Sequence, residues 1–167
     1  MRKLWMLTAI VLLAGLTLGA VALARGGGGQ EFEAKLDGYQ EVNSKSTVAR
    51  GTFDARLRGN SIRYRLSYRN LETPALFAHI HFAQRHVNGG VIAFLCGGGS
   101  KPEPCPESTG TVRGTITPED IIGPDDQGIE LGSFREAVRA LKAGAVYANV
   151  HSERFPGGEI RGQVKRD

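Results

Sequence analysis

Residues 62–69 read IRYRLSYR, and this stretch decides the fold class. Apolar or aromatic side chains at Ile62, Tyr64, Leu66 and Tyr68 alternate with polar ones. Successive side chains of a β-strand point to opposite faces, so this two-residue period predicts a strand with one buried and one solvated face. Half-buried strands of this kind are typical of antiparallel sheets.

Similar segments lie on both sides of this stretch, and turn residues such as Gly59 and Asn60 separate them. Further strands are predicted at residues 31–36, 52–57, 76–82, 90–95, 110–117, 145–151 and 159–164. Residues 133–143 differ, because their apolar side chains recur at helical spacing. The sequence therefore predicts a mainly β domain, either an antiparallel β-sandwich or a small Greek-key barrel of about eight strands, with one short helix.

The N-terminus has the pattern of an export signal. Arg2 and Lys3 precede a long apolar run without charge, and residues 22–24 supply small side chains where a signal peptidase cuts. We expect residues 1–24 to be removed, which leaves no stable membrane anchor. The alternative is an uncleaved anchor, because about 20 apolar residues span a bilayer.

Cleavage at this point divides the chain into a signal peptide at 1–24, a glycine-rich linker at 25–30 and a β-domain at 31–167. The mature protein is then secreted or lies in the periplasm or cell envelope. The whole chain has 21 Lys and Arg against 17 Asp and Glu, and two of the basic residues leave with the signal. The remaining charge of about +2 does not indicate a nucleic-acid partner.

Cys96 and Cys105 are the two cysteines of the chain. An exported protein meets an oxidising compartment, and the glycines and prolines between the two residues allow a loop to close. We predict a disulfide between them. A redox or metal-binding pair is the alternative, although the spacing is not Cys-x-x-Cys.

Three histidines are candidate metal ligands. His79 and His81 are two residues apart on one predicted strand, so their side chains share a face. His151 ends another predicted strand and joins them if the two strands are neighbours. Three imidazoles suit copper or zinc. The alternative, that these are buried structural histidines hydrogen-bonded to their neighbours, stays open.

Three further residues near the C-terminus have predicted structural roles. Glu159 and Arg161 share a face of the last strand, which predicts a salt bridge between them. A catalytic role for Glu159 lacks a second acid for acid–base work. Asn149 is predicted to brace a turn or to orient a histidine through its amide.

The polar face of the second and third strands carries a basic stripe of Arg56, Arg63, Arg65 and Arg69. Such a stripe can bind a polyanion, or it can be an ordinary solvated sheet face.

Three motifs in order resemble the CHRD domain family, first described in chordin. They are AHIH at 78–81 followed by Gly89, GAVYANVH at 144–151, and PGGEIRGQ at 156–163. The resemblance covers about 31–164 and implies an extracellular or envelope β-sandwich module with no firmly assigned reaction. The insert between the cysteines departs from the family pattern, and so does the segment after His81, where many members continue with Gly-Pro.

Three classes of function follow from these observations. The first is a non-enzymatic binding or structural module whose partner is an unidentified protein or small ligand. The second is a copper- or zinc-binding protein that uses the three histidines. The third is a redox enzyme similar to copper–zinc superoxide dismutase, which also has a His-x-His strand, but this chain lacks the aspartate-bearing zinc loop of that family. No catalytic residue is assigned, because the sequence contains no nucleophile elbow, phosphate loop or zinc-protease motif.

Overall fold

The burial pattern of β3 (Ser61–Arg69) confirms the two-residue period on which the fold prediction rests. Ile62, Tyr64, Leu66 and Tyr68 are buried in a computed structural model of the protein, and the arginines between them are exposed. The structure describes residues 29–167. The predicted signal peptide and most of the predicted linker lie outside the described residues.

Nine strands and four short helices follow one another along the described chain. They are β1 (Gln30–Asp37), η1 (Gly38–Gln40), β2 (Arg50–Arg58), β3, β4 (Ala75–Phe82), β5 (Gly90–Cys96), β6 (Gly110–Ile116), η2 (Pro118–Asp120), η3 (Asp125–Gln127), α1 (Phe134–Lys142), β7 (Val146–Ser152), β8 (Ile160–Gln163) and β9 (Lys165–Arg166). The eight predicted strands and the predicted helix are all present. The two-residue β9 was missed, because so short a segment has no periodicity of its own.

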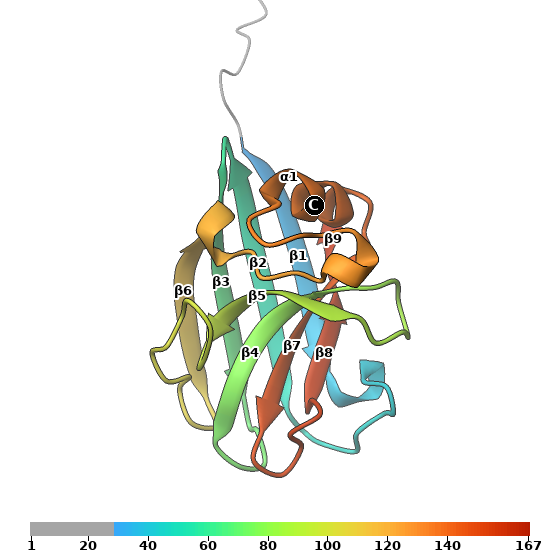
Figure 1. The fold of residues 1–167 in the computed structure, drawn as a ribbon. Coiled ribbons are helices and arrows are strands. Elements are labelled where there is room, and N and C mark those ends of the chain that lie inside the picture. Colours follow the sequence, from blue (N-terminus) through green and yellow to red (C-terminus); the bar gives the residue numbers. More distant parts are fainter. Residues whose placement is uncertain (1–28) are drawn as a thin grey trace, which may run out of the picture.

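The strands form one sheet in the order β5-β4-β7-β8-β1-β2-β3-β6, and every pairing is antiparallel. Figure 1 shows the sheet curled into a nearly closed barrel, with β4, β5 and β7 in front of β1, β2 and β3. Of the two predicted architectures, the barrel is therefore the one that forms. Its interior is filled by alternate side chains of both walls, such as Phe53, Leu66, Ile92 and Val150.

Helix α1 lies across one end of the barrel (Figure 1). It buries Phe134, Ala137 and Leu141 in the common core, and Gly144 ends it with a φ of 70°.

The predicted disulfide joins Cys96 at the end of β5 to Cys105, with 5.2 Å between their Cα atoms. No helix among the described residues is long and apolar enough to cross a membrane.

Candidate metal centre

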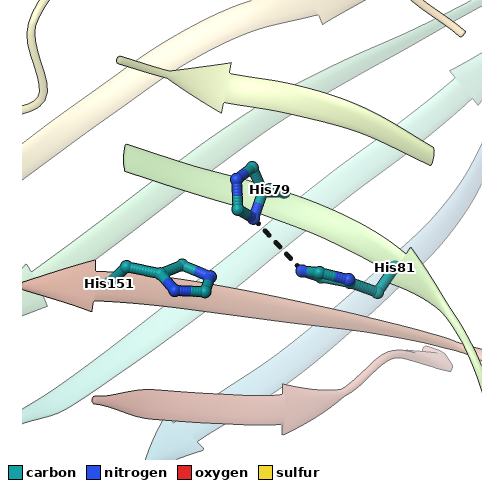
Figure 2. Close-up of side chains that lie close together, drawn as sticks. All are labelled: His79, His81 and His151. Atoms are coloured by element: carbon teal, nitrogen blue, oxygen red, sulfur yellow. Dashed lines mark hydrogen bonds between the residues drawn. The ribbon is translucent and has the colours of Figure 1, made fainter. Parts of the chain in front are cut away.

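The pairing of β4 with β7 brings the three candidate histidines together. In the antiparallel register, His151 lies opposite Phe77, and Asn149 lies opposite His79. Paired residues share a face of the sheet, so all three imidazoles lie on the outward face, opposite the core side chains of Ile80 and Val150. Figure 2 shows the three rings converging from the two strands. The fourth histidine, His86, lies in the loop after β4 and is exposed.

The ligand atoms of these rings are close to one another. His79 Nδ1 lies 3.1 Å from His81 Nε2, and one nitrogen from each ring falls within 4.8 Å of the other two. The ring centroid of His79 is 4.7 Å from that of His151. The condition set by the sequence, that the two histidine-bearing strands are neighbours, is therefore met.

Backbone carbonyls fix the tautomers of two of the three rings. His81 Nδ1 lies 3.0 Å from the Gly89 carbonyl oxygen, and His151 Nδ1 lies 2.9 Å from that of Pro156. A carbonyl only accepts a hydrogen bond, so both Nδ1 atoms carry the proton and both Nε2 atoms carry a lone pair. His79 Nδ1 donates to the lone pair of His81. The Nε2 of His151 is buried and has no hydrogen-bond partner among residues 29–167.

Burial keeps all three imidazoles neutral. Their exposed fractions are 5% for His79, 8% for His81 and 7% for His151. Desolvation lowers the pKa of His79 to about 2, and electrostatic repulsion from His151 and His81 contributes to this shift. Desolvation also lowers the pKa of His81 to about 4, although the hydrogen bond to the Gly89 carbonyl opposes this shift. The pKa of His151 is lowered by desolvation as well. Neutral imidazoles are the form that binds metal ions.

Aromatic rings surround the three imidazoles. The Phe77 ring centroid lies 4.9 Å from that of His79 and 4.6 Å from that of His151, and Phe94 meets His79 edge-on at 4.5 Å. Tyr147 stacks on His81 with an interplanar angle of 1° and a centroid distance of 4.6 Å. These rings were not predicted to surround the cluster. The two-residue period offered a signal, because Phe77 and His79 are two residues apart on one strand and so share a face.

The match to a known family covers almost the same range as the barrel. Residues 32–164 match the CHRD domain. The chain belongs to the CHRD domain family. Searches of curated proteins and of solved structures each gave no match. CHRD domains are extracellular or secreted, and the disulfide of this CHRD domain is consistent with an oxidising compartment.

The guanidinium of Arg161 holds the loop of this CHRD domain that contacts His81 through the Gly89 carbonyl. It donates to the carbonyl oxygens of Val87 at 2.6 Å and Gln84 at 3.4 Å, and to Asn88 Oδ1 at 3.1 Å. It also lies 3.4 Å from the centroid of Tyr147, the ring that stacks on His81. Because Gly89 in the same loop fixes the His81 tautomer, Arg161 indirectly orients that ring.

The predicted salt bridge between Glu159 and Arg161 is wrong, because the ion pairs of residues 29–167 do not include it. Each residue has separate partners. Glu159 Oε1 accepts from Thr47 Oγ1 at 2.8 Å and from the Glu72 backbone N–H at 3.1 Å. Glu159 therefore ties the loops that contain Thr47 and Glu72 to the barrel, in line with a structural role. Its donors are neutral groups rather than the guanidinium of Arg161.

Asn149 has a partner that was not predicted, besides a side-chain hydrogen bond with His81 that raises the pKa of that imidazole. Its Nδ2 donates to Glu41 Oε1 at 2.5 Å, and Glu41 is itself only 5% exposed. Burial raises the pKa of Glu41 to about 7, although Arg161 and the Asn149 hydrogen bond lower it. Sequence reasoning missed Glu41 as part of this region, because its loop reaches Asn149 only through tertiary structure.

Proposed function

We propose that this protein is an exported, non-enzymatic CHRD module that binds copper or zinc through His79, His81 and His151. One observation carries the proposal: the His151 Nε2 lone pair is buried, has no partner among the described residues and belongs to a set of three convergent imidazoles. A buried polar atom without a partner costs about 1–3 kcal/mol. A metal ion bound at this point removes that cost.

The donor set supports a borderline transition metal. All three donors are neutral imidazole nitrogens, which suit zinc and copper better than magnesium or calcium. Bonds of about 2.0–2.1 Å place two ligands of a tetrahedral ion roughly 3.4 Å apart. The 3.1 Å separation of His79 Nδ1 and His81 Nε2 fits this spacing, and the other separations, of up to 4.8 Å, require the rings to rotate on binding. Binding also requires His79 to carry its proton on Nε2, which frees Nδ1.

The burial of the cluster supports binding over catalysis. The three rings are at least nine-tenths buried, and Phe77, Phe94 and Tyr147 pack around them. An ion held there is shielded from a diffusing substrate, which disfavours the superoxide-dismutase-like alternative. Export is supported by the signal pattern of residues 1–24, the disulfide and the family.

A matched pair of histidine variants tests the metal site. We expect the purified exported protein to bind one Cu²⁺ or Zn²⁺ per chain in a chelator-competition titration. His151→Ala should weaken binding by about 100-fold or more, since it removes one of three ligands. His86→Ala should bind like the parent, because His86 lies outside the cluster. An unchanged affinity in His151→Ala, or no binding by the parent, refutes the site.

Two further measurements test the other parts of the proposal. N-terminal sequencing of the exported protein should begin at Arg25, and a mature chain that retains residues 1–24 contradicts cleavage. The copper-loaded protein should show no superoxide dismutase activity above that of free copper. Activity that depends on His151 would replace the non-enzymatic assignment with the redox alternative.

A further inference from the structure

The outward face of β2, β3 and β6 carries arginines directly opposite one another. The register pairs Arg50 with Arg69, Arg56 with Arg63, and Arg65 with Arg113. All six side chains are exposed. Figure 1 shows these strands on the wall of the barrel away from β4 and β7, so this arginine face is remote from the histidines.

Like charges directly opposite each other destabilise a sheet. Among the ion pairs of residues 29–167, only one involves any of these six arginines, the 3.3 Å contact between Arg56 and Glu31. Arg65 donates to the neutral Ser67 Oγ, and Arg50 donates to two backbone carbonyls. The register also places Asp37 opposite Arg50 and Asp54 opposite Arg65. Each arginine pair therefore keeps one member, Arg63, Arg69 or Arg113, with no acidic residue directly opposite it, and an anionic partner would stabilise these three.

The acidic residues on this side of the barrel are on β1 and β2, and the outward side chains of β3 and β6 include none. Glu31, Glu33 and Asp37 are on β1, and Asp54 is on β2. The outward residues of β3 and β6 are arginine, serine or threonine. The arginine face therefore presents its positive charge mainly along β3 and β6.

A groove of about 690 Å³ runs over part of this face. Its lining combines cations and hydroxyl groups with one carboxylate, that of Asp37; the cations and hydroxyls include Arg50, Arg65, Arg69, Thr52, Ser67 and Thr111. Guanidinium groups bind sulfate, phosphate and carboxylate through paired hydrogen bonds, and side-chain hydroxyls both donate to and accept from other hydroxyls. From the Arg50–Arg69 pair to the Arg56–Arg63 pair is six residues, or about 20 Å along the strands. That length suits a chain with several charges better than a single ion.

We propose that the arginine face binds an acidic polysaccharide. A polysaccharide fits better than a single-stranded nucleic acid, because the tyrosines of β3 point into the core and cannot stack on bases. Tyr64 and Tyr68 are 5% and 3% exposed, so the face offers hydroxyls and guanidinium groups but no aromatic platform from β3. The site is distinct from the proposed metal centre and does not depend on it.

The test compares dextran sulfate with neutral dextran of the same length, using the purified exported protein at low ionic strength. The test variant is Arg65→Gln with Arg113→Gln, which removes one opposed pair. The control is Arg135→Gln with Arg139→Gln on α1, which removes the same charge from exposed side chains elsewhere.

We expect the parent to bind dextran sulfate and not neutral dextran. The test variant should bind about 10-fold more weakly or worse, and its log–log salt slope should fall by about 2, roughly one for each cation removed. The control variant should change affinity by less than about 2-fold, because exposed charges far from the ligand are screened. His151→Ala should bind dextran sulfate like the parent.

The melting temperature of the test variant separates lost binding from lost folding. It should stay close to that of the parent, because the lost Arg65–Arg113 repulsion offsets the lost attraction between Arg65 and Asp54 across the sheet. Equal losses in the test and control variants would overturn the proposal, and so would binding of neutral dextran. Tighter binding of single-stranded DNA than of dextran sulfate, lost in the same test variant, would assign the face to nucleic acid instead.

Discussion

The buried titratable groups around the histidine cluster predict an unusual dependence of stability on pH. The pKa of His79 is lowered to about 2 and that of His81 to about 4, whereas an unfolded histidine titrates near 6.5. A group with a lowered folded pKa makes its full contribution to stability above its unfolded pKa. The unfolded chain therefore binds more protons below about pH 6.5, and these two residues destabilise the folded state as the pH falls.

Glu41 acts in the opposite direction. Burial raises its pKa to about 7, from an ordinary value of 4.5. The folded state binds this proton more tightly than the unfolded state, so stability is greatest below about pH 4.5 and falls as the pH rises to about 7. Between these limits the carboxyl and the two imidazoles have opposing effects.

The magnitudes show which effect is larger. At about 1.4 kcal/mol per pH unit and group, acidification from about pH 7 to about pH 5 destabilises the metal-free protein by roughly 2 kcal/mol through each of His79 and His81. Protonation of Glu41 offsets roughly 2 kcal/mol of that loss. The net loss in the parent is therefore roughly 2 kcal/mol, and the lowered pKa of His151 adds to it.

The variant Glu41→Gln isolates the carboxyl, because glutamine resembles the protonated acid and still accepts from Asn149. It should be more stable than the parent by about 3 kcal/mol near pH 8, and this advantage should shrink to about 1 kcal/mol near pH 5. The assay is urea unfolding in the presence of a chelator across this range. Glu33→Gln is the control, because Glu33 is paired with Lys165 and its pKa lies below 4.5, outside the range. If Glu41→Gln and the parent give parallel pH profiles, the reasoning is refuted.

Three other perturbations have expected results. Replacing Cys96 and Cys105 by serine should reduce the free energy of unfolding by about 2.5–3 kcal/mol, because the unfolded chain gains loop entropy; an unchanged urea midpoint contradicts this. Leu66→Ala should lower the free energy of unfolding by about 2–5 kcal/mol, because Leu66 is 0% exposed in the core and its loss leaves a cavity. A smaller loss, measured by thermal unfolding, would show that neighbouring side chains move in to fill the cavity. Gly158→Ala should destabilise the protein by more than about 1 kcal/mol, because Gly158 has a φ of 119° and an added Cβ would lie 2.7 Å from Glu41 Oε1. Equal stability of parent and Gly158→Ala would show that this turn relaxes.

Local patterns in the sequence determined the strands and part of the site. Alternation along 62–69 follows from the geometry of a single strand, so β3 and its buried face were predictable without its neighbours. For the same reason the sequence placed His79 and His81 on one face. The cysteines were also predictable, since a short gap in an exported chain favours closure.

The tertiary structure decided what depends on contacts between distant parts of the chain. Pairing of β4 with β7 brings His151 to the other two imidazoles, across about 70 residues of sequence, and no local pattern encodes that pairing or its register. The same holds for Arg161, predicted to pair with Glu159, which instead clamps the loop before Gly89. Periodicity predicts which side chains share a face, but only the packed barrel decides which neighbours each side chain contacts and how deeply it is buried. Contacts with neighbours set the hydrogen bonds of the site, and contacts and burial together set its pKa values.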